Sequence, residues 1–119
     1  MIALARGEEI EIHEPPEEAA ISAVTLCGLH LAVLIASARQ RPGRLATLAY
    51  TERRFTVLAV DARVAPHYGR LVALGRRAGK ARLRPADALI AATGAAHDLP
   101  LLTRDRDFKG LDGVEVVLV

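Results

Sequence analysis

Short apolar runs alternate with longer helical segments along this chain, and this alternation constrains the fold more than any other feature. A connection that carries a helix between two strands leaves those strands parallel. We therefore predict an α/β fold with a mostly parallel sheet, built as a single domain over residues 1–119. Because aromatic residues make up 3% of the chain, its core must consist of Ala, Leu, Val and Ile. The predicted strands are residues 20–22, 56–60, 99–103 and 114–119, and the predicted helices are residues 2–6, 24–40, 44–53, 62–78 and 86–97.

Composition excludes several classes of protein. A single cysteine, Cys27, allows no internal disulfide and no cysteine-based zinc site. No apolar run reaches the roughly 18 residues that a membrane-spanning helix needs. The N-terminal residues lack the basic and apolar regions of a secretory signal. We expect a cytoplasmic protein without a membrane partner.

Charge is distributed very unevenly along the chain. Residues 39–84 hold twelve Lys or Arg and two acids, a formal charge of +10, whereas residues 1–38 carry −5 and residues 85–119 carry −3. A basic segment of this kind fits a polyanion such as RNA. It also fits an ordinary solvated helix surface rich in arginine, so charge alone does not separate the two interpretations.

Three aspartates stand at positions that suit a site at the carboxyl edge of the sheet. Asp105 and Asp107 follow the predicted strand 99–103, and parallel sheets bind ligands beyond the carboxyl ends of their strands. Asp87 lies in the first turn of a predicted helix, where free N–H groups favour a carboxylate. Clustered carboxylates beside a basic surface are what metal-dependent phosphodiester chemistry requires. Taken singly, each aspartate also fits a structural role, as a helix N-terminal charge or in a turn.

Three segments carry a pattern that is more specific than a generic α/β fold. They read AISAVTL at 20–26, PADALIAAT at 85–93 and LPLLTRDRDF at 99–108. In this order they resemble the PIN-domain ribonucleases, specifically the VapC-type toxins of prokaryotic toxin–antitoxin pairs. The opening residues IALARGE look like that family's first helix, so the resemblance extends over nearly the whole chain.

The resemblance implies a three-layer α/β/α fold and an endoribonuclease that depends on Mg²⁺ or Mn²⁺. It also implies RNA as substrate, inhibition by a VapB-type antitoxin, and a homodimer. Asp87 and Asp105 match two of the family's four acids and would act as catalytic residues and metal ligands, with Asp107 as an accessory ligand. Thr103 would help to hold the site by hydrogen bonding. The predicted contacts to the RNA backbone are Arg76, Arg77, Lys80, Arg82, Arg84, Arg104 and Arg106.

Two departures from the family pattern are visible in the sequence. The family opens with a strand that ends in Asp-Thr or Asp-Ser, and this strand and its acid are predicted to be missing here. The family's second acid is a glutamate at the position of Gly28. An alternative function is therefore a catalytically silent PIN domain that binds only antitoxin or RNA. A start upstream of Met1 is a third interpretation. The nearly all-apolar helix 24–40 is expected to be either buried core or an interface.

Overall fold

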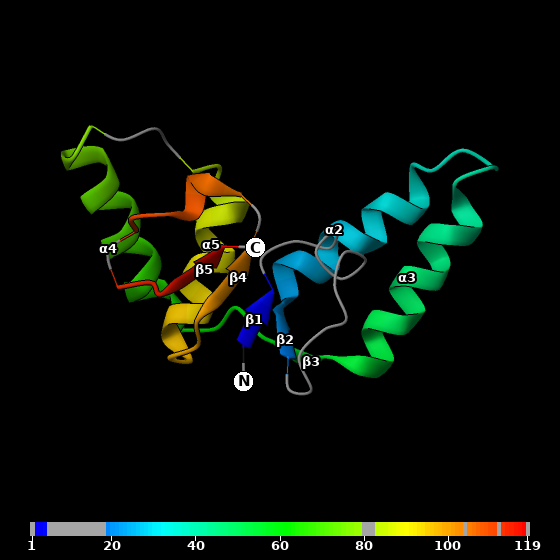
Figure 1. The fold of residues 1–119 in the computed structure, drawn as a ribbon, viewed down its shortest axis with the longest axis horizontal. Coiled ribbons are helices and arrows are strands. Elements are labelled where there is room, and N and C mark those ends of the chain that lie inside the picture. Colours follow the sequence, from blue (N-terminus) through cyan, green and yellow to red (C-terminus); the bar gives the residue numbers. More distant parts are fainter. Residues whose placement is uncertain (1, 5–18, 80–82, 104, 112, 119) are drawn as a thin grey trace.

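The computed structural model describes residues 2–4, 19–79, 83–103, 105–111 and 113–118. Its centre is a five-stranded parallel sheet with the strand order β3-β2-β1-β4-β5 (Figure 1). The prediction of a mostly parallel α/β fold is confirmed, and four of the strands lie within a few residues of their predicted places. The strands are β1 (Ile2–Leu4), β2 (Ala19–Ser22), β3 (Thr56–Leu58), β4 (Leu101–Thr103) and β5 (Val116–Leu118).

The prediction that the first strand is missing was wrong. Residues Ile2–Leu4 form β1, which pairs with β2 on one side and with β4 on the other. Residues 2–6 were predicted to be helical, but a three-residue apolar run between two parallel strands completes the backbone hydrogen bonds of both neighbours. This long-range pairing outweighs a local helix preference. Residues 5 and 6 lie outside the described residues.

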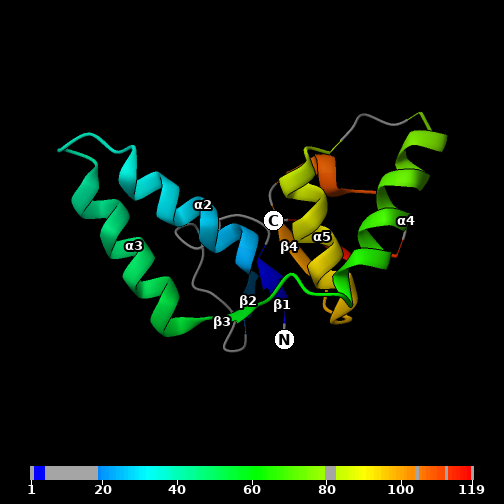
Figure 2. The same cartoon turned by 180° about the vertical axis from the view of Figure 1, so that it is seen from behind.

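Four helices are described, and they cover both faces of the sheet. Figures 1 and 2 show α4 and α5 on one side and α2 and α3 on the other, so the predicted three-layer arrangement is confirmed. One core cluster joins Ala91 of α5 to Leu101 of β4, and a second joins Ile21 of β2 to Leu29 of α2. The helices are α2 (Ala23–Leu34), α3 (Arg41–Arg54), α4 (Val64–Arg77) and α5 (Pro85–Ala96), and a short 3₁₀ helix, η1, spans Arg106–Phe108.

The apolar helix α2 is not fully buried. Its C-terminal part leaves Leu31 57% and Leu34 78% exposed, and Ile35, which follows it, is 69% exposed. Of the two environments that the sequence allowed for this helix, core or interface, the first is therefore wrong for this end. None of the helices that the structure describes is long and apolar enough to cross a membrane.

Candidate active site

The carboxyl ends of the described strands meet at one edge of the sheet, because each strand is parallel to its neighbours. Helix α5 ends at Ala96, and a short connection leads from there to the start of β4. The helix therefore runs back across the sheet and begins near the carboxyl edge. This topology brings the first turn of α5 and the residues after β4 to the same end of the molecule (Figure 1).

Asp87 lies in the first turn of α5 and is buried, with 7% of its surface exposed. The sequence forms a helix here because Arg84 adopts an extended conformation before it and Pro85 occupies its first turn, where a missing N–H costs nothing. The Arg84 Nε lies 3.6 Å from Asp87 Oδ2. A buried carboxylate is thus held at a helix N-terminus, where the unsatisfied N–H groups stabilise negative charge.

Asp105 follows β4 and begins the turn that contains Asp107. One carboxylate oxygen of Asp105, Oδ1, accepts the backbone N–H of Asp107 at 2.9 Å. The backbone N–H of Asp105 donates to the hydroxyl of Thr103, at 3.0 Å, and Thr103 is fully buried. The hydrogen bond predicted for Thr103 is therefore present. The two contacts fix the backbone and the side-chain direction of Asp105, while Asp107 is exposed.

The two acidic positions are linked through the core. Ala88, the neighbour of Asp87, and Phe108, three residues after Asp105, belong to one buried cluster, and both are almost completely inaccessible. This shared cluster connects the helical turn that carries Asp87 with the turn that Asp105 begins. The topology places the turns that carry Asp87, Asp105 and Asp107 at one edge of the sheet. These three described acids do not form a group arranged to hold a metal ion, so their shared metal site stays a prediction.

Ser22 is a buried polar residue at this edge to which the sequence interpretation assigned no role. It ends β2 and caps α2, since its hydroxyl oxygen accepts the N–H of Val24 at 3.1 Å. The same hydroxyl lies 3.3 Å from that of Thr93 in α5. Because Thr93 donates its proton to the carbonyl of Leu89, at 2.7 Å, Ser22 is the donor between the two hydroxyls. A serine directly before a helix is a sequence signal for a helix cap, and this signal indicates the capping role of Ser22. No sequence signal indicated its hydrogen bond to Thr93 in α5.

Gly28 occupies the α2 position where the family pattern has a glutamate. It is exposed, and a Cβ atom added there would meet nothing within 4 Å. The glycine is therefore not required by any close contact among the described residues. The six glutamates between residues 8 and 18 lie outside the described residues, and the structure assigns no place to them.

Four of the seven predicted RNA-contacting cations lie among the described residues. Arg76 and Arg77 form the last turn of α4, Arg84 precedes α5, and Arg106 begins η1. All four are exposed. Arg76 lines the same pocket as Pro85, so the end of α4 is close to the start of α5. The other three predicted cations, Lys80, Arg82 and Arg104, lie outside the described residues.

Asp61, an aspartate outside the acidic site, has a pKa below its usual value. A hydrogen bond from the Arg63 side chain lowers the pKa of Asp61, and the backbone N–H of Arg63 adds to the effect. Asp61 is exposed and precedes α4, so it keeps its negative charge at neutral pH without contributing to the site at the carboxyl edge.

The donor atoms at the carboxyl edge are carboxylate oxygens, which suit a hard divalent cation. Mg²⁺ keeps several waters and binds proteins through one or two carboxylates, so Asp87 and Asp105 fit its requirements. Within the described ranges, no group of three or more His, Cys, Asp or Glu residues is arranged to hold a metal ion. The described residues of the site therefore supply few metal ligands and do not surround an ion on all sides.

Comparison with known proteins identifies the family. The PIN-domain family model matches residues 2–114. Ribonuclease VapC4 from Mycobacterium tuberculosis is 36% identical over 99 residues, which cover 83% of this chain and 75% of the relative. Ribonuclease VapC5 from the same organism is 37% identical over 122 residues, covering 99% of this chain and 89% of the relative.

Solved structures agree with the sequence relatives. The crystal structure of VapBC-5 from M. tuberculosis, described as a member of the VapBC family of toxin–antitoxin systems, superimposes with a TM-score of 0.85 at 33% identity, covering 99% of this chain and 98% of the matched chain. The fold also matches DNA-bound VapBC from Salmonella typhimurium, with a TM-score of 0.82 at 23% identity over 98% of both chains. Together with the acids at the carboxyl edge, these matches show that the chain belongs to the PIN-domain family and, within it, to the VapC-type toxins.

Proposed function

We propose that this chain is a metal-dependent endoribonuclease toxin, which cleaves RNA and is neutralised by a VapB-type antitoxin. The relatives that are at least 36% identical are named ribonucleases, which supports nuclease chemistry at the shared fold. The observation that carries the proposal is the placement of Asp87 and Asp105. One is buried at a helix N-terminus, the other is oriented by two hydrogen bonds, and both lie beyond the carboxyl ends of the strands.

Asp87 and Asp105 would hold the Mg²⁺ or Mn²⁺ ion, and Asp107 would be an accessory ligand from the exposed side. Such an ion supplies Lewis-acid polarisation of the scissile phosphate and stabilises the charge that develops there. Asp105 is fixed by the hydrogen bonds of its turn, so its carboxylate needs little reorganisation to bind. The exposed guanidinium groups of Arg84 and Arg106 stand beside these acids in the chain and would position the RNA backbone.

The VapB-type partner is supported by the relative of known structure. The M. tuberculosis protein that shares 33% identity with this chain was solved as a VapBC toxin–antitoxin system. A chain of the same family with the same fold is expected to bind an antitoxin of the corresponding type. Co-expression with a VapB-type protein and recovery of one stable complex would be the direct check on this partner.

Cleavage of labelled RNA tests the enzymatic part of the proposal. With Mg²⁺ or Mn²⁺ the chain should cleave RNA, and EDTA should stop the reaction. Asp87→Asn should lower the rate by at least about 100-fold, because loss of even a group that supports a metal ligand typically costs 10–100-fold. Asp98→Asn is the matched control, because Asp98 is exposed at the opposite end of α5 and its φ of 56° suits asparagine equally well.

Equal loss in both variants, or cleavage that persists in EDTA, would contradict the assignment of Asp87 to a metal site. If the unaltered chain cleaves no RNA but binds antitoxin, the chain is the catalytically silent PIN domain of the alternative hypothesis. The sparse set of metal-ligating residues in the described part of the chain is the observation that favours this second function.

A further inference from the structure

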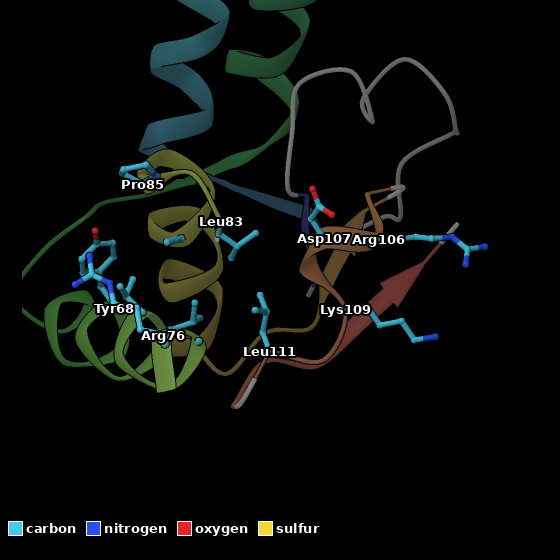
Figure 3. Close-up of a pocket in the computed structure, with 12 residues that line it drawn as sticks. Tyr68, Arg76, Leu83, Pro85, Arg106, Asp107, Lys109 and Leu111 are labelled. Atoms are coloured by element: carbon cyan, nitrogen blue, oxygen red, sulfur yellow. The ribbon is translucent and has the colours of Figure 1, made fainter. Parts of the chain in front are cut away.

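A pocket of about 450 Å³ opens between α4, the first turn of α5 and the turn formed by η1. Figure 3 shows Tyr68 and Arg76 on the α4 side, and Asp107 and Leu111 on the side of the turn. Its wall is mainly apolar, with the buried Leu71 and the partly buried Leu83 and Leu111. This size and polarity are typical of sites for small organic groups, which range from about 300 to 1,000 Å³.

The pocket shares two structural elements with the acidic site. Pro85 and Ala88 line it from the same helical turn that carries Asp87. Arg106 and Asp107 line it from the turn that Asp105 begins. An RNA strand bound at Asp87 and Asp105 would therefore pass the mouth of the pocket close to the phosphate that is cleaved.

We propose that this pocket receives one unstacked base of a single-stranded RNA substrate, next to the phosphate that is cleaved. The inference rests on the proposed ribonuclease function and adds to it a determinant of which RNA sequence is cut. Proteins that read single-stranded RNA splay bases out of the stack and place them against aromatic or arginine planes. Tyr68 and Arg76 supply such groups on the α4 wall, and the leucines supply apolar contact.

Charge around the pocket favours RNA over a peptide segment as its occupant. The exposed cations Arg76, Arg106 and Lys109 line it, against one acidic lining residue, Asp107. In Figure 3 the side chains of Arg106 and Lys109 extend away from the pocket, along the outer side of the turn. On that outer side they would contact phosphates that continue past the turn, and phosphate contacts contribute much of the affinity for nucleic acid.

Gly75 offers a way to fill the pocket without disturbing the fold. It lines the pocket from α4, and a Cβ atom added there would meet nothing within 4 Å. Gly69 is the matched control because it lies in the same helix, also has open space around its Cβ position, is exposed and is not one of the pocket-lining residues. Gly75→Leu and Gly69→Leu therefore make the same chemical change in one helix, and only the first occupies the pocket.

Binding is measured first, without metal, so that the RNA stays intact. Single-stranded RNA hexamers of mixed sequence are titrated in EDTA while methyl resonances of Leu83 and Leu111 are followed by NMR. We expect saturable shifts that persist in Gly69→Leu and vanish in Gly75→Leu, with affinity about tenfold lower, as expected for the loss of one stacked base. Unshifted methyl resonances, or equal shifts in both variants, would overturn the proposal. Shifts caused by a VapB-type antitoxin but not by RNA would also overturn it.

Cleavage is then mapped on a randomised RNA library with Mg²⁺. The unaltered chain and Gly69→Leu should share a base preference beside the cleaved bond, and Gly75→Leu should lose it. Cleavage with an identical preference in all three proteins would overturn the pocket while leaving the ribonuclease function standing. Binding at the pocket without cleavage by any of the proteins would overturn the ribonuclease function while the base-binding pocket remains.

Discussion

Two buried hydroxyl groups connect three elements of the fold beside the acidic site. Ser22 and Thr93 are 71 residues apart in the chain, and their hydroxyls are 3.3 Å apart. Ser22 also caps α2, and Thr93 also bonds to a carbonyl of its own helix. The pair therefore fixes the ends of β2, α2 and α5 relative to one another, close to the helix that carries Asp87.

Thr93→Val should lower the free energy of unfolding by about 1–3 kcal/mol, because it leaves the buried Ser22 hydroxyl without its acceptor. Thr47→Val is the control. The Thr47 hydroxyl also donates to a carbonyl four residues earlier, at 3.2 Å, but at an exposed site. It should cost less than about 0.5 kcal/mol. Urea denaturation of both variants measures the difference, and equal losses would contradict the structural role given to Thr93.

Local residue patterns predicted part of the site and could not predict the rest. Asp87 and Asp105 follow local signals, a proline-led helix start and a strand end, but their role in a site was implied by the resemblance of segments 85–93 and 99–108 to the PIN-domain family. The same resemblance implied a hydrogen-bonding role for Thr103 without a named partner, and the structure shows its hydroxyl accepting the backbone N–H of Asp105. The link between Ser22 and Thr93 and the pocket beside η1 depend on how distant segments pack, and no short pattern encodes that packing.

At the level of elements, β1 shows how tertiary pairing overrides a local preference. Its residues are equally suited to a helix in isolation, and the sequence interpretation placed them in one. Between β2 and β4 the same residues satisfy the backbone groups of both neighbours. For helix α2, an apolar composition predicted either burial or an interface. The C-terminal end of the helix is exposed, so burial is wrong there and the interface stays a prediction.

Gly28→Glu tests whether a further carboxylate on α2 completes the site. The structure leaves room for the side chain, so the substitution should fold normally and remove the helix cost of glycine, about 1 kcal/mol. We expect the cleavage rate with Mg²⁺ to rise by about tenfold or more through better metal binding. Gly69→Glu, on exposed α4, adds the same charge elsewhere and should leave the rate unchanged. An increase in both variants, or in neither, would contradict a role for the α2 position.

At the level of the whole molecule, the chain is elongated, with principal extents of 44 × 29 × 29 Å. The α2–α3 pair forms one end of it (Figure 2). Leu31, Leu34, Ile35 and Leu45 are exposed at this pair, and contiguous exposed apolar surface commonly marks an interaction site. In α2 itself the ionisable residues are Cys27 and His30, while Arg41 and Arg44 of α3 donate hydrogen bonds to the carbonyls of Ala36 and Ala32 at the edge of this surface.

The homodimer expected from the family resemblance is predicted to use this surface. Leu34→Glu should weaken dimerisation by at least about tenfold, because it places a charge in an apolar contact. Val60→Glu is the control, since Val60 is 43% exposed in the connection after β3. Sedimentation of the two variants over a range of concentrations measures the dissociation. A dimer that survives Leu34→Glu, or a monomer in the unaltered chain, would contradict this prediction.

The central claim is that Asp87 and Asp105 form one divalent-metal site, and Mn²⁺ binding followed by electron paramagnetic resonance tests it most directly. We predict that the unaltered chain and Asp98→Asn bind one Mn²⁺ ion per chain at the same affinity. Asp87→Asn and Asp105→Asn should each weaken this binding by at least about tenfold while the circular dichroism spectrum is unchanged. Retention of full Mn²⁺ affinity in either active-site variant, or no binding by the unaltered chain, would contradict the account.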